Sequence, residues 1–72
     1  MIIDTPKDLA RLVRSRRKEL GLTQAELAEL AGVSARFVFD LEAEKPAVAF
    51  DLVRSVAKTL GLTIEMQVKL ID

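Results

Sequence analysis

The 72-residue sequence contains no cysteine and no histidine. The absence of cysteine excludes disulfide bonds, a thiolate nucleophile and a cysteine-ligated zinc site, and the absence of histidine removes the commonest metal ligand and general base. Acidic pairs such as Glu26 with Glu29 therefore lack the partner that acid–base or metal chemistry usually needs. We expect no catalytic residue, no metal and no cofactor, so the protein is predicted not to be an enzyme.

No pattern typical of a secretion or membrane signal is recognised in the sequence. Residues Met1 to Lys7 do not combine a positive charge with a long apolar run, and no apolar stretch approaches the roughly 20 residues needed to cross a bilayer. We therefore predict a cytoplasmic protein with no membrane association.

An excess of charge of one sign is missing as well. Eleven basic residues balance eleven acidic ones, whereas proteins that bind nucleic acid usually carry a basic surface. The distribution is uneven, because only Asp8 opposes the cations between residues 7 and 18. These cations are Lys7, Arg11, Arg14, Arg16, Arg17 and Lys18. They either keep a helix face solvated or contribute phosphate contacts.

What remains is the composition of one small folded domain over 1–72. Half of the residues are hydrophobic and 31% are charged, which is a normal globular balance. A core of this size leaves only a few kcal/mol of net stability. A second subunit would add to that stability.

Capping residues, proline and glycine divide a helical body over 5–61 into four expected helices. The first begins with Thr5 as its cap and Pro6 in its first turn, and it ends near Gly21. Its apolar stripe is Leu9, Leu12, Val13 and Leu20. The fourth helix runs from about Phe50 to Leu60 and turns Val53, Val56, Ala57 and Leu60 inward.

The segment from Thr23 to Glu42 contains the other two helices. Thr23 and Glu26 form a capping box, Gly32 permits a sharp turn, and Ser34 caps the helix that follows. The inward residues are Leu27, Val33, Val38 and Leu41. Two short helices joined by a tight turn are typical of a helix-turn-helix, whose second helix enters the major groove of DNA.

The end of the chain has a different period. Apolar residues alternate with mostly polar ones from Leu62 onward, which predicts a β-strand over 62–71. A lone strand leaves its backbone groups unpaired, and only Met1 to Ile3 offers another strand in the same chain. We therefore expect a two-fold homodimer with an antiparallel ribbon of paired strands. Its interface residues are Leu62, Ile64, Met66 and Val68.

The run Leu-Gly-Leu-Thr-Gln-Ala-Glu-Leu-Ala-Glu-Leu-Ala-Gly-Val-Ser over residues 20–34 resembles the Cro/cI-type (XRE) helix-turn-helix family. The resemblance covers about residues 9–61. With its alternating end, the chain is most similar to the HipB-type antitoxins, which are small dimeric repressors that bind a HipA-type kinase toxin. The resemblance implies a mostly α, four-helix, lambda-repressor-like domain with a C-terminal β-strand.

The same resemblance implies which residues meet double-stranded DNA. They are Thr23, Gln24, Ser34, Ala35, Arg36, Phe39 and Asp40. Arg36 suits either guanine or a phosphate, Gln24 either adenine or a phosphate, and Lys45 a phosphate. Phe39 either touches a thymine methyl group or is partly buried. Asp40 either accepts from a cytosine amino group or opposes DNA with its charge.

Two further positions carry structural expectations. Arg17 and Glu42 fall on apolar stripes, where a charge requires a partner. The family resemblance implies that they form a buried ion pair. Glu44 stands where the family usually has a glycine after the recognition helix.

We predict a sequence-specific repressor that binds a palindromic operator with half-sites about one helical turn apart. The resemblance implies an antitoxin that autoregulates a HipA-type toxin–antitoxin operon. One alternative is a stand-alone or phage-type regulator with no toxin. Another is a protein-interaction module that has lost DNA binding, which the zero net charge and Asp40 favour.

Overall fold

The computed structural model describes residues 6–45 and 49–63. Four helices lie in these ranges: α1 (Pro6–Glu19), α2 (Gln24–Ala31), α3 (Ala35–Glu42) and α4 (Phe50–Thr59). Their bounds agree with the predicted helices to within a residue or so, and the described part of the chain is all-α. The lambda-repressor-like arrangement expected from the sequence is therefore confirmed for the helical body.

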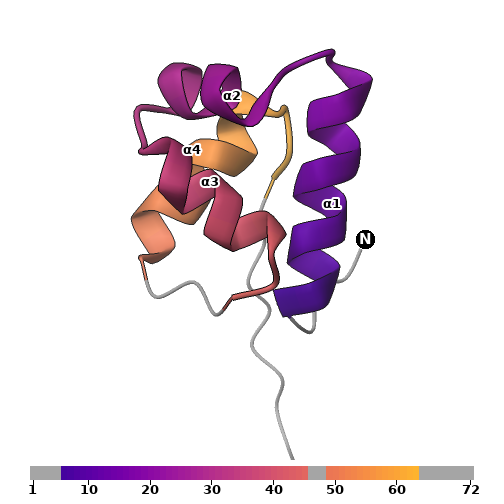
Figure 1. The fold of residues 1–72 in the computed structure, drawn as a ribbon, viewed down its shortest axis with the longest axis vertical. Helices are drawn as coiled ribbons and strands as arrows, with labels where there is room; N and C mark the ends of the chain where they lie inside the picture. Colours follow the sequence, from indigo (N-terminus) through magenta and orange to yellow (C-terminus); the bar gives the residue numbers. More distant parts are fainter. Residues whose placement is uncertain (1–5, 46–48, 64–72) are drawn as a thin grey trace, which may run out of the picture.

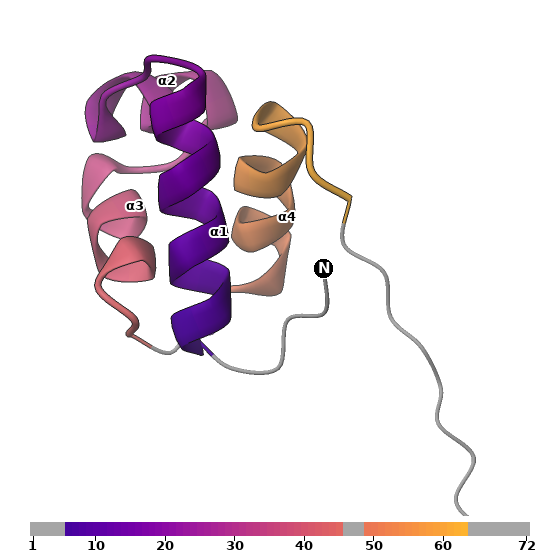
Figure 2. The ribbon, with the colours of Figure 1, turned by 90° about the vertical axis from the view of Figure 1, so that its right-hand side faces the viewer.

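The helices pack around one core. α2 packs against both α3 and α4, and α1 packs against α3. Figure 1 shows α2 lying across the ends of the other helices, and Figure 2 shows α3 and α4 on opposite sides of α1. The buried residues of this core are Val13, Leu27, Ala28, Val38, Leu41, Val53, Val56 and Leu60. Because they come from all four helical segments, the core fixes how α3 is presented at the surface.

Each of the four described helices ends in the same way. A residue in the left-handed conformation follows the helix, and its N–H and the next one bond back to carbonyls of the last turn. Gly21, Gly32 and Gly61 fill this position after α1, α2 and α4, with φ of 70°, 72° and 73°. After α3 the position is held by Glu44, with φ of 67°. The departure from glycine noted in the sequence therefore falls on a strained backbone.

Leu20 corrects the predicted apolar stripe of the first helix. α1 ends at Glu19, so the helical period no longer directs the next side chain inward. Leu20 is 43% exposed, whereas Val13 of the same stripe is 1% exposed. Ala10, which the stripe did not include, is buried at 3% exposure.

The predicted strand over 62–71 falls mostly outside the described residues. Leu62 and Thr63 lie in no strand, and the side chain of Leu62 packs against the helical core of its own chain. Ile64, Met66 and Val68 lie outside the described ranges, as do Thr5 and Met1 to Ile3. The strand and its pairing therefore remain predictions.

Candidate nucleic-acid interface

Local hydrogen bonds fix both the start of α2 and the turn between α2 and α3. The Glu26 N–H donates to Thr23 Oγ1 at 3.0 Å, and the Thr23 N–H donates to Glu26 Oε1 at 2.9 Å. These two bonds are the predicted capping box. The bond from the Thr23 N–H to the carboxylate, followed by a hydrogen bond from the Thr23 side chain, lowers the pKa of Glu26 below its ordinary value. At the other end of α2, Gly32 reverses the chain and the Val33 N–H bonds to the Ala28 carbonyl at 3.0 Å. The start of α2 and the turn after it are thus rigidly set.

α3 presents one buried and one exposed face. Ser34 Oγ accepts a hydrogen bond from the Phe37 N–H at 3.0 Å and caps the helix as predicted. Val38 and Leu41 are 0% and 3% exposed. On the opposite face, Ala35, Arg36 and Phe39 are exposed and Asp40 is half-exposed. This is the division into inner and outer residues that the helical period predicts.

Arg17 and Glu42 join α1 to the last turn of α3. Arg17 Nε donates to Glu42 Oε2 at 2.7 Å and Nη2 donates to Oε1 at 2.9 Å, so the pair is bidentate. The side chains are only 12% and 4% exposed. The hydrogen bonds that Arg17 donates to Glu42 outweigh partial burial and, with the negative charge of Glu42, raise the pKa of Arg17. The structure therefore brings together the two residues that the family resemblance paired.

Gln24 joins the same network, which the sequence did not predict. Its Nε2 donates to Glu42 Oε1 at 3.2 Å, while Arg17 Nη1 donates to the Leu22 carbonyl at 2.8 Å. Glu42 thus anchors the first residue of α2 as well as α1. The side-chain amide of Gln24, a predicted DNA contact, is held in place by a buried carboxylate.

Asp40 forms ion pairs with Arg36 and Lys45 on the outer side of α3. Its Oδ1 accepts from Arg36 Nε at 3.1 Å and lies 3.3 Å from Lys45 Nζ. Partial burial acts to raise the pKa of Asp40, but the hydrogen bonds and charges of Lys45 and Arg36 outweigh it, so the pKa is lowered. The sequence analysis placed these residues on one face without pairing them. The i, i+4 spacing of Arg36 and Asp40 is the signal that predicts the contact.

Phe39 completes this cluster. The Cζ atom of Arg36 lies 5.8 Å from the centroid of the Phe39 ring, within the range of a cation–π contact. The Phe39 side chain remains 50% exposed. Phe39 therefore lies outside the core, and its ring packs against the guanidinium of Arg36.

The basic segment of α1 divides into two groups. Arg16 and Arg17 are half-buried, and Arg16 Nε donates to the Leu60 carbonyl at 2.8 Å, which ties α1 to the end of α4. This structural role of Arg16 was not predicted. The other cations of the segment are exposed: Lys7, Arg11, Arg14 and Lys18. Only the exposed ones are accessible to phosphate.

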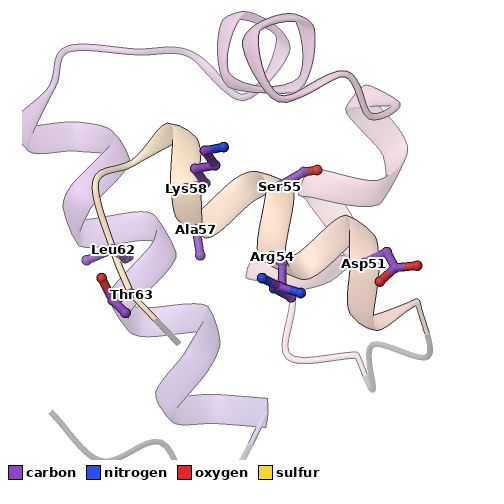
Figure 3. A pocket seen from close by; sticks show the side chains of 7 residues that line it. All are labelled: Asp51, Arg54, Ser55, Ala57, Lys58, Leu62 and Thr63. Atoms are coloured by element: carbon purple, nitrogen blue, oxygen red, sulfur yellow. The ribbon is translucent and has the colours of Figure 1, made fainter. Parts of the chain in front are cut away.

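A hollow of about 370 Å³ lies on another part of the surface (Figure 3). Its lining residues are Asp51, Arg54, Ser55, Ala57, Lys58, Leu62 and Thr63. None of them comes from α2 or α3, so this hollow is separate from the cluster around Asp40. Within the described ranges, no group of three or more acidic side chains is arranged to hold a metal ion, and no helix is long and apolar enough to span a membrane.

Two short helices joined by a fixed turn, the second with an exposed outer face, define the class of DNA-binding helix-turn-helix proteins. Residues 13–66 match the helix-turn-helix family, and the chain belongs to this family of non-enzymatic transcriptional regulators. The membership confirms the Cro/cI-type assignment made from residues 20–34.

Among particular relatives, the chain is 50% identical over 64 residues to the uncharacterized HTH-type transcriptional regulator y4mF of Sinorhizobium fredii. The match covers 89% of this chain and 84% of that protein. A solved complex of HipB with an O2 20mer is similar in fold, with a TM-score of 0.80 at 24% identity and 93% of both chains covered. A HipA-HipB-O2-O3 complex gives a TM-score of 0.81 at 21% identity, over 97% of this chain and 99% of that one. At these identities the likeness to HipB concerns the fold.

Proposed function

We propose that this helix-turn-helix regulator is a sequence-specific repressor that reads DNA with the outer face of α3. The observation that carries the proposal is Arg36, whose side chain is 73% exposed on the helix that this fold inserts into the major groove. Its guanidinium offers donors for a guanine or a phosphate. The neighbouring Ala35 and Phe39 offer apolar surface for a thymine methyl group.

Phosphate contacts at the two helix starts would set the position of α3 on the duplex. Thr23 and Ser34 are exposed at the N-termini of α2 and α3, where N–H groups and the helix dipole favour anions. Each hydroxyl accepts a capping bond, and a hydroxyl can donate its own hydrogen as well. The Thr23 hydroxyl also bonds to the Glu26 carboxylate, so at the start of α2 the backbone N–H groups are the main donors for a phosphate. We assign Gln24 and Lys45 to the same backbone-positioning role.

The proposed working form is a homodimer on a palindromic operator, with its two recognition helices in successive major grooves. The alternating sequence over 62–71 supports pairing of two strands. Leu62 packs against the core of its own chain, so its substitution would also affect folding. The test therefore uses a residue further along the predicted strand. We expect Met66→Lys to convert the dimer to a monomer of 8.0 kDa in light scattering. Gln67→Lys is the matched control, because the alternating pattern places this residue on the opposite side of the predicted strand, and this variant should remain dimeric.

We further propose that the protein is the antitoxin of a HipA-type operon, that it acts in the cytoplasm and that it represses its own promoter. The similarity in fold to HipB, in complexes that include O2 DNA and HipA, supports this assignment. Co-purification of a HipA-like kinase encoded beside this gene is the expected result. A gene with no such neighbour would indicate a stand-alone regulator with the same DNA contacts.

Selection of genomic DNA fragments by the purified protein tests DNA reading directly. We expect enrichment of a palindrome, and loss of binding or of sequence preference in Arg36→Ala. Arg54→Ala is the control, because Arg54 is an exposed arginine on α4 and not on α3. If no duplex is enriched, the protein is an interaction module. The observation that favours this second candidate is the exposed Phe39 beside Asp40.

A further inference from the structure

The contact between Arg36 and Asp40 uses one side of the guanidinium and leaves the other available. Asp40 Oδ1 accepts from Nε at 3.1 Å, one helical turn away from Arg36. Among the described residues, no hydrogen bond engages Nη1 or Nη2, and the side chain is 73% exposed. The ring of Phe39 lies 5.8 Å from Cζ and restricts the guanidinium from one side. Within the described part of the chain, the Nη1 and Nη2 donors of this exposed side chain are therefore available to a ligand.

The geometry of the free end matches one base. Nη1 and Nη2 present two parallel N–H groups, which fit the O6 and N7 acceptors of guanine in the major groove. A phosphate can also accept two parallel N–H bonds from a guanidinium, but the Asp40 carboxylate that accepts from Nε repels a phosphate and not an uncharged base edge. Holding Nε therefore favours base reading over phosphate binding for this arginine.

Asp40 is itself held in position. Lys45 Nζ lies 3.3 Å from the same Oδ1 atom. Lys45 follows Glu44, and its N–H bonds to the Asp40 carbonyl at 3.1 Å, so the end of α3 places the lysine beside the carboxylate. The two cations lower the pKa of Asp40 and keep it ionised. The cluster carries one negative and two positive charges, which limits its attraction for phosphate.

We propose that Asp40 is a positioning residue that orients Arg36 to recognise guanine, so that each operator half-site contains a G·C pair under Arg36. The inference deepens the proposed DNA reading by α3 and rests on it. It also gives the negative charge on the groove face a role in specificity. Contact between Asp40 and a cytosine amino group is the rival account.

The test measures the affinity of the protein for operators that carry each of the four base pairs at each position. The wild-type protein and each variant are compared in the same competition assay. We expect a guanine preference of about tenfold or more at one position of each half-site. Asp40→Ala and Asp40→Asn should reduce this preference to less than about threefold, while affinity for unrelated duplex stays level or rises, because a negative charge near phosphate has been removed. Arg36→Lys should weaken the same preference, since an ammonium lacks the planar pair of parallel N–H groups and the Nε atom that Asp40 holds.

Controls separate this inference from the function on which it rests. Glu29→Ala removes an exposed carboxylate from α2 and should leave the preference unchanged. Arg36→Ala combined with Asp40→Ala should match Arg36→Ala alone. An undiminished guanine preference in both Asp40 variants would overturn the positioning role. Loss of preference at a different base pair from that of Arg36→Lys would assign Asp40 to cytosine instead. Failure of the wild-type protein to enrich any duplex would reject DNA reading itself.

Discussion

Removal of Glu42 is expected to cost about 3 to 5 kcal/mol of the free energy of unfolding. The Glu42 carboxylate is 4% exposed and accepts from Arg17 Nε, Arg17 Nη2 and Gln24 Nε2. The Arg17 guanidinium is only 12% exposed in the wild-type protein, and in Glu42→Ala it keeps the Leu22 carbonyl as its remaining acceptor among the described residues. A domain of this length has a total stability of about 4 to 11 kcal/mol. The loss is therefore a large share of the total.

Urea unfolding followed by far-ultraviolet circular dichroism measures this effect, because the sequence has no tryptophan or tyrosine for fluorescence. Glu19→Ala is the matched control. It breaks an arginine–glutamate pair whose side chains are 36% and 64% exposed, and it should cost no more than about 1 kcal/mol. If Glu42→Ala is unfolded without urea, the double variant Arg17→Met with Glu42→Leu should restore folding by replacing the charges with apolar volume. A Glu42→Ala midpoint equal to that of Glu19→Ala would refute the reasoning.

Three further changes have defined outcomes. Glu44→Gly should raise the free energy of unfolding by about 0.5 to 1 kcal/mol by relieving φ of 67°, whereas Ala43→Gly, at φ of −86°, should lower it. Ser34→Ala should cost about 1 kcal/mol through loss of the α3 cap, and an unchanged urea midpoint would contradict this. The pKa of Glu26 is lowered in the folded state, so its ionised carboxylate stabilises the fold fully above the unfolded-state pKa near 4.5. This stabilisation is lost as the pH falls through the folded-state pKa. In Glu26→Gln, the free energy of unfolding should therefore decrease less as the pH is lowered through this range.

The helix boundaries could be predicted because the sequence encodes them locally. The capping box at Thr23, the cap at Ser34 and the glycine after α2 are signals that lie within a few residues of the bonds they form. The same local code explains the error at Leu20. Its helical spacing from Val13 was correct, but the chain leaves the helix at Glu19, one residue before Leu20.

Contacts between distant segments were less accessible to prediction. The bond from Gln24 to Glu42 spans 18 residues and depends on how α2 and α3 pack, which no local pattern specifies. The bond from Arg16 to the Leu60 carbonyl spans 44 residues. The spacing showed only that Arg17 and Glu42 each fall on an apolar stripe, and the family resemblance implied that they pair with each other. Helix-forming residues thus define the elements, whereas the side-chain network of the site depends on tertiary packing.

The neutral net charge constrains how this protein can bind DNA. Arg16 and Arg17 are occupied by structural hydrogen bonds, and the charge of Asp40 offsets one of its two neighbouring cations, Arg36 and Lys45. Several exposed cations remain, but those of α1 and α4 lie outside the helix-turn-helix, so we expect only about one or two cations of each subunit to displace counterions. A dimer should then show a slope of only about −2 to −4 for the logarithm of the binding constant against the logarithm of the salt concentration. Base contacts would supply most of the remaining affinity, so non-specific binding should be weak. A slope near −10 in a salt titration of operator binding would show instead that the exposed cations of α1 lie on phosphates, and that affinity comes mainly from charge.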